Sequence, residues 1–189
     1  MRRLANELGC DPMSLYRHAD SKSALLDGVA EIVRDQVTVD PNAPDWQAEL
    51  THTAEQFLAQ ALAHPNVVPL MVSRPVAVPL ALQSPGTLRL LEDVLELLIR
   101  AGFSRAQALH AYRTFFAFLN GHLRNEIHES TADQGETELL LRLQLHRLPQ
   151  NTYPRIRELS NPVSTYDGEQ ELRYGLTVLL AGLEALLYA

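Results

Sequence analysis

A chain of 189 residues with a net charge of −7 and 46% hydrophobic residues is long enough for one large domain, or for a small domain joined to a larger one. No apolar run is long enough to span a bilayer, the N-terminus has no signal-peptide pattern, and a single cysteine, Cys10, excludes an internal disulfide. These features predict a cytoplasmic protein that does not enter a membrane.

The acidic charge is unevenly distributed along the chain. Arg2, Arg3, Arg17 and Lys22 outnumber the acidic residues of the first 22 positions, and most of the acidic excess lies beyond residue 36. The N-terminal segment is therefore neutral to slightly basic, in front of an acidic body. This distribution is compatible with DNA binding in which non-specific attraction to phosphates contributes little.

Residues 1–36 have the pattern of a helix-turn-helix. Gly9 ends a predicted helix over 2–8, because glycine accepts the positive φ of a helix end. Pro12 suits the first turn of a second helix, over 12–18. In a helix-turn-helix, the second helix enters the major groove of DNA.

A third helix follows, and Asp20 or Ser21 can cap it. The stretch 39–44 contains two prolines and has no periodicity, so we predict a linker there. The expected domains are a helix-turn-helix domain over 1–38 and a larger helical domain over 45–189.

Helix signals continue through the larger domain. Asp45 and Asp167 can cap helices, and Ser104 with Gln107 forms a capping box. Prolines restrict residues 67–82 to short helical pieces, and residues 139–148 alternate like a strand but are expected to be helical or irregular. The other expected helices cover 45–64, 84–101, 104–129 and 168–188, with a short one around Ile156. The fold class is therefore all-α.

The N-terminal segment resembles the DNA-binding head of the TetR family of one-component repressors. The residues that carry this resemblance are Leu4, Ala5, Leu8, Gly9, Leu15, Tyr16, His18, Lys22, Ala24, Leu25 and Leu26. Weaker matches continue through Trp46, Phe57, 73–75, 101–103 and 175–184, in the order of the subgroup whose ligand domain is like that of the tetracycline repressor. The resemblance implies a two-domain homodimer that is released from double-stranded operator DNA by a small-molecule effector.

The resemblance also implies which residues face DNA. The recognition helix would be 12–18, and the expected DNA-binding residues are Arg2, Arg3, Ser14, Tyr16, Arg17, His18 and Lys22. The side-chain chemistry is suitable, since Arg17 could pair with a guanine and Ser14 or His18 could hydrogen-bond base edges. Tyr16 and Lys22 could contact phosphates, although packing within the small domain is an equal alternative for Tyr16.

One difference from the family concerns the start of the chain. Family heads begin with another helix, whereas Met1 here stands just before the second one. Without that additional helix, the inner faces of Leu4, Leu8, Leu15 and Leu25 would be exposed to water. Burying one such side chain stabilises the folded state by roughly 1.5–3 kcal/mol. We therefore expect the native protein to begin upstream.

A second difference concerns the ligand. Tetracycline-type pockets use polar and metal-binding side chains where this chain places Thr38, Thr53, Leu70 and Val94, so we expect a more apolar effector than tetracycline. The expected ligand-binding residues are Phe57, Leu58, Leu70, Val94, Leu95, Leu98, Tyr112 and Phe116. Core packing is an alternative for each aromatic residue among them.

The apolar stripes of helices 104–129 and 168–188 are expected to form the homodimer interface, because reading a palindrome requires two heads. The alternative is that both stripes face only the internal core. His64, His110, His122, His128 and His146 match no zinc pattern, so we expect neither a metal nor a cofactor.

Two other functions compete with a regulator. A helical ligand-binding or oligomeric protein that has lost DNA binding would have the same body. An enzyme is disfavoured, because the chain has no nucleophile elbow and no phosphate-cradling glycine-rich loop.

Overall fold

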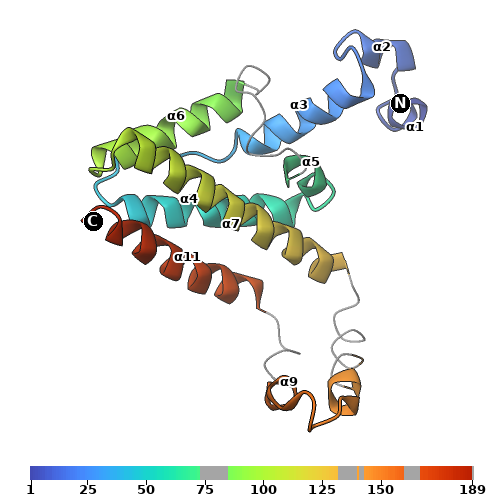
Figure 1. The fold of residues 1–189 in the computed structure, drawn as a ribbon. Coiled ribbons are helices and arrows are strands. Elements are labelled where there is room, and N and C mark those ends of the chain that lie inside the picture. Colours follow the sequence, from blue (N-terminus) through green and yellow to red (C-terminus); the bar gives the residue numbers. More distant parts are fainter. Residues whose placement is uncertain (73–84, 132–139, 141–142, 160–166, 189) are drawn as a thin grey trace. The chain divides into compact units, whose positions relative to one another are not determined.

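The computed structural model describes residues 1–72, 85–131, 140, 143–159 and 167–188. All regular secondary structure within these ranges is helical, as predicted. The helices are α1 (Arg2–Glu7), α2 (Pro12–Tyr16), α3 (Lys22–Arg34), α4 (Trp46–Ala63), α5 (Val68–Val72), α6 (Pro85–Arg100), α7 (Arg105–Thr131), α9 (Pro154–Glu158) and α11 (Gly168–Ala185) (Figure 1).

The chain forms two compact units, Met1–Asn120 and Gly121–Ala189, which divide within α7. The boundary that we predict at 39–44 lies inside the first unit. In the described part of the chain, no helix is both long and apolar enough to cross a membrane.

Residues at the helix ends determine where the first three helices begin and end. Gly9 has a φ of +64° after α1, as predicted for a helix end. The Asp11 carboxylate accepts a hydrogen bond from the Met13 amide (2.7 Å) and so caps α2. Of the two candidate caps of α3, Ser21 is the one used, and its hydroxyl oxygen accepts from the Ala24 amide at 3.1 Å.

The caps predicted for the longer helices are also confirmed. Asp45 accepts hydrogen bonds from the amides of Gln47 and Ala48, both at 3.0 Å, at the start of α4. Ser104 and Gln107 form the reciprocal capping box of α7, with distances of 2.9 and 3.3 Å.

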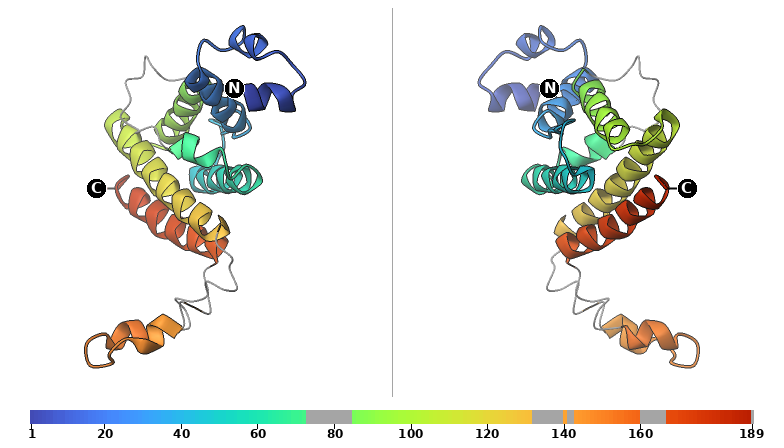
Figure 2. Two further views of the ribbon diagram at one scale, coloured as in Figure 1. Left: turned by 90° about the vertical axis from the view of Figure 1, so that its right-hand side faces the viewer. Right: turned by 90° about the vertical axis from the view of Figure 1, so that its left-hand side faces the viewer.

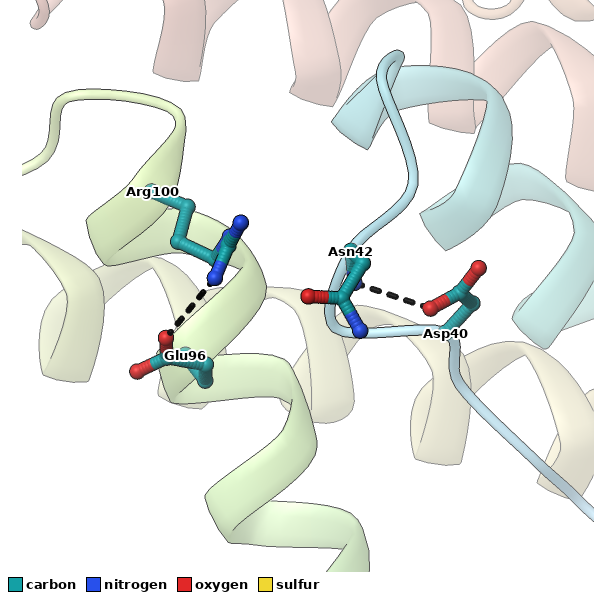
Figure 3. A network of polar contacts seen from close by, with 4 residues as sticks. All are labelled: Asp40, Asn42, Glu96 and Arg100. Carbon is teal, nitrogen blue, oxygen red and sulfur yellow. Dashed lines mark hydrogen bonds and ion pairs between the residues drawn. The ribbon is translucent and has the colours of Figure 1, made fainter.

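The segment between α3 and α4 is bound along α4. The Gln56 side-chain oxygen accepts from the Thr38 amide at 2.9 Å, and the Glu49 carboxylate accepts from the Asp40 amide at 2.7 Å. Asp40 also accepts from the Asn42 amide at 2.8 Å, which tightens the turn (Figure 3). Since Val37 and Val39 are buried here as well, the predicted linker is a fixed connector.

The core of the first unit is formed by α4, α6 and the first part of α7. Its fully or almost fully buried side chains include Leu50, Ala54, Phe57, Leu58, Ala61, Val94, Leu97, Leu98, Phe115, Phe116 and Leu119. Leu62, the neighbour of the buried Ala61, is 52% exposed. Helix α3 packs against α5 and α6 (Figure 2).

Of the apolar stripe predicted on the last helix, α11 buries Leu172, Leu176, Leu180 and Leu183, whereas Leu179 and Leu187 are half-buried. Asp167 caps this helix by accepting from the Gln170 amide at 3.1 Å. Within the ambiguous stretch 139–148, residues 140 and 143–147 are helical, and residues 139, 141 and 142 lie outside the described residues. The short helix expected around Ile156 is α9.

Candidate DNA-binding surface and ligand site

The expected DNA-facing residues lie on α1, on α2 and at the start of α3. Arg17 is the residue that ends α2, and Lys22 is the first residue of α3. Both are exposed, as are His18, Arg2 and Arg3, whereas Ser14 is half-buried and Tyr16 is 43% exposed. These side chains are therefore open to a ligand in the first unit of the molecule.

Helices α1 and α2 pack against each other, and each buries one apolar side chain, Ala5 and Leu15 respectively. The expectation that Leu15 would be exposed is therefore wrong. Leu4 and Leu8 are exposed by 39% and 62%, as expected, and Leu25 is half-buried.

Four aromatic side chains meet between α4 and α7. Phe116 lies at their centre, with its ring centroid 5.7 Å from that of Phe57, 4.7 Å from that of Tyr112 and 5.1 Å from that of Phe115. The contacts with Phe57 and Phe115 are edge-to-face, the geometry in which each pair adds about 0.5–1.5 kcal/mol beyond its buried area. We call Phe57, Tyr112, Phe115 and Phe116 the aromatic cluster.

Tyr112 brings a polar group to this cluster. Burial raises the pKa of its phenol above the usual value of 10.0, because the anion is disfavoured away from water. The hydroxyl therefore stays protonated at neutral pH and can both donate and accept a hydrogen bond. An apolar site with one such group is a common type of small-molecule site.

The other expected ligand-binding residues are buried to different extents. Val94, Leu98 and Leu58 are buried, and Leu70 and Leu95 are half-buried. Phe115 is missing from the sequence-based set, because it precedes Phe116 and falls beside the stripe that helical spacing predicts. Sequence reasoning would include Phe115 only if the buried face of this helix were taken to be wide enough to hold two adjacent residues.

The second unit contains a polar cluster whose members come from two helices, α7 and α11. Residue spacing within one helix therefore cannot predict it. His122 of α7 is 92% buried and hydrogen-bonds to the backbone of Gly168, and both Glu126 and Glu171 act on it electrostatically. Burial is the largest influence and lowers the pKa of His122, against the opposing effect of the two carboxylates. Because Gly168 and Glu171 lie on α11, only the fold brings them to His122.

The carboxylate of Glu126 lies directly over Gly168. A Cβ at Gly168 would overlap Glu126 Oε2, a buried atom for which the described residues provide no hydrogen bond. A larger residue at this first position of α11 would require the Glu126 side chain to move. Among the described residues, no group of three or more His, Cys, Asp or Glu side chains has the arrangement of a metal site.

Comparisons with known proteins show the family. The family described as "Tetracyclin repressor-like, C-terminal domain" matches residues 39–187. The chain is 29% identical over 195 residues to the HTH-type transcriptional repressor DrrR1 of Streptomyces coeruleorubidus, covering 98% of this chain and 70% of that protein. It is 27% identical over 192 residues to the class C tetracycline repressor of Escherichia coli, covering 98% and 81% of the two chains.

Solved structures give the same result. The TetR family protein ActR of Streptomyces coelicolor, in complex with actinorhodin, superposes with a TM-score of 0.83 at 26% identity, over 99% of this chain and 87% of that chain. The apo form of ActR superposes with a TM-score of 0.78. The chain therefore belongs to the TetR family of ligand-responsive transcriptional regulators.

Proposed function

We propose that this regulator is a homodimeric repressor that an apolar small molecule releases from its operator. The helix-turn-helix would contact DNA through α2 and the start of α3, and the effector would lie beside the aromatic cluster. The repressor role is supported by the similarity to DrrR1, and ligand sensing is supported by the similarity to ActR bound to actinorhodin.

The proposal that the protein senses a small molecule is supported mainly by the position of the aromatic cluster. It lies in the core, between α4 and α7, with the protonated hydroxyl of Tyr112 at its edge. Thr53, at a position where tetracycline-type pockets have a polar side chain, donates its hydroxyl to the Glu49 carbonyl at 2.8 Å. Because the Thr53 hydroxyl donates its proton to the backbone of its own helix, it does not donate to a ligand. This favours an aromatic or apolar effector over a metal–drug chelate.

The DNA-binding part is tested by fluorescence anisotropy with duplexes from the intergenic DNA that flanks the gene. Replacing Arg17 by alanine should weaken binding to the preferred duplex about 10-fold or more, because a bidentate contact to a base is worth about 1–3 kcal/mol. Lys22→Ala should weaken binding to all duplexes similarly and reduce the salt dependence. Arg105→Ala, an exposed arginine at the start of α7, is the matched control. Equal binding by the Arg17 variant and the wild type would contradict the assigned recognition helix.

The ligand-binding part is tested with actinorhodin as the probe and tetracycline as the comparison. We expect actinorhodin to bind more tightly than tetracycline and Phe57→Leu to weaken actinorhodin binding, since a ring face is lost while the core stays filled. Isothermal titration calorimetry measures both. The control is Phe103→Leu. This substitution also removes a buried ring, but one that packs on Trp46 and not in the aromatic cluster. Tighter binding of tetracycline than of actinorhodin would argue against an apolar site.

A further inference from the structure

Helix α2 has one side that packs on α1 and an opposite side that is open to solvent. Leu15, on the packed side, is only 9% exposed. Because successive residues of a helix are about 100° apart, Met13 lies about 160° around the helix from Leu15. Met13 is 68% exposed, more than any other large apolar side chain described in α1 and α2. It therefore lies near the centre of the solvent side of α2.

Met13 shares this side with two of the expected DNA-binding residues. Tyr16 and Arg17 follow it by three and four positions, the spacings at which side chains are neighbours on a helix surface, and both are exposed. Ser14, another expected DNA contact, is half-buried. The structure thus presents Met13, Tyr16 and Arg17 together on α2, and Ser14 only in part.

The backbone at Met13 is held by the cap of its helix. The Asp11 carboxylate accepts from the Met13 amide at 2.7 Å, and the Asp11 carbonyl accepts from the Ser14 amide at 2.9 Å. The side chain of methionine is unbranched and has a polarizable thioether, so it adapts to irregular apolar surfaces. Met13 is therefore fixed in register on the helix but can adjust to what it contacts.

The place of Met13 in the helix matters more than its exposure, since single exposed apolar side chains are common on protein surfaces. In a helix-turn-helix, the N-terminal residues of the second helix contact base edges in the major groove. Met13 is the second residue of α2. A thioether is at most a weak hydrogen-bond acceptor, and the apolar group that base edges present in the major groove is the C5 methyl of thymine.

We propose that Met13 reads a thymine by packing on its C5 methyl group, one helical turn before the base that Arg17 contacts. This inference rests on the proposed function, because it requires α2 to enter the major groove. Four residues of helix advance about 6 Å, and successive base pairs are about 3.4 Å apart. With the reach of the two side chains added, the thymine lies within about three base pairs of the guanine that Arg17 reads.

The first experiment removes single methyl groups from the DNA. Each thymine of the preferred duplex is replaced in turn by deoxyuridine, which keeps every hydrogen-bonding group of thymine and lacks only the C5 methyl. Binding is measured by fluorescence anisotropy. At one thymine of a half-site, the wild type is expected to lose about fourfold in affinity, the factor that corresponds to one buried methyl-sized group.

Variants of the protein then connect this loss to Met13. Met13→Ala should bind the thymine and uracil duplexes equally at that position, whereas Met13→Leu, with an apolar side chain of similar volume, should keep most of the discrimination. The matched control is Ile32→Ala, which removes a 65% exposed side chain from α3 and should keep the full discrimination. An undiminished effect of uracil in Met13→Ala would overturn the inference.

The second experiment locates the guanine that Arg17 reads. Each guanine of the same duplex is replaced in turn by 7-deazaguanine, which lacks the N7 acceptor of an arginine contact. The guanine read by Arg17 is the one whose replacement weakens binding by the wild type but not by Arg17→Ala. It should lie within about three base pairs of the thymine sensed through Met13, and a greater separation would overturn their assignment to one side of α2.

The outcomes distinguish this inference from the proposed function. A wild type that binds none of the flanking duplexes would contradict the proposed function and the role of Met13 together. Binding that depends on Arg17, without any thymine methyl group sensed through Met13, would support the recognition helix and overturn this inference alone.

Discussion

Buried polar side chains in the described core each have a defined structural reason. Thr53 and His122 are the two polar residues that are buried there. Thr53 bonds within α4, whereas His122 depends on α11 through Gly168 and Glu171. The sequence shows that His122 and Glu126 share a helix face, but it does not show their partners, because those lie on a helix that the chain reaches much later.

His122 makes the stability of the protein depend on pH. Burial lowers its pKa below the ordinary 6.5, so the unfolded chain binds a proton more readily than the folded one. The stabilisation from the neutral imidazole is present above pH 6.5 and is lost as the pH falls through the lowered pKa. We expect the free energy of unfolding in urea to decrease over this range, and His122→Gln to reduce the decrease.

The control for this prediction is His110→Gln, in which an exposed histidine of the same helix is replaced. It should leave the pH dependence unchanged. Nuclear magnetic resonance titration gives the pKa of His122 directly. A value above that of free histidine would mean that Glu126 and Glu171 outweigh burial.

Helix ends were the elements most easily predicted. Asp45, Ser104 with Gln107, and Asp167 all act as caps, because a side chain and an amide two or three residues away are neighbours in any fold. The anchoring of Thr38 to Gln56 was not predictable in this way, since it depends on how the connector crosses α4. Burial shows the same contrast between local and long-range determinants. The burial of Leu172 and Leu176 is predicted by helical spacing, and that of Phe115 is not.

Asp45 should contribute measurably to the stability of α4. Asp45→Ala removes the acceptor of two amide hydrogen bonds, so we expect a loss of about 0.5–2 kcal/mol in the free energy of unfolding. Asp20→Ala is the matched control, because Ser21 caps α3 in its place. Urea denaturation followed by circular dichroism measures both. Equal losses for the two variants would show that the cap of α4 is not what stabilises it.

The whole molecule presents an apolar face on α11 that is separate from its buried stripe. Tyr174, Val178 and Leu186 are exposed by 69%, 60% and 48%. We expect this face, rather than the buried stripe, to contact the second subunit of the proposed dimer. A regulator that reads a palindrome needs such a surface, because two identical heads require a twofold axis.

We expect light scattering after size exclusion to give twice the chain mass of 21.1 kDa. Val178→Glu should lower this mass at micromolar concentration, since an unpaired charge would be buried in the interface. Ile156→Glu places the same charge on α9, outside the proposed interface, and should leave the mass unchanged. A monomer mass for the wild type at all concentrations would rule out the dimer.

The anchored connector determines where this protein could be recombined with another. An exchange of DNA-binding specificity made by splicing within residues 38–42 would have to preserve the register of Thr38 and Asp40 with Gln56 and Glu49. A junction before Lys22 avoids that requirement, because α3 then stays with the helices that it contacts. The exchanged segment should therefore end before Lys22, and α3 is inherited with the body.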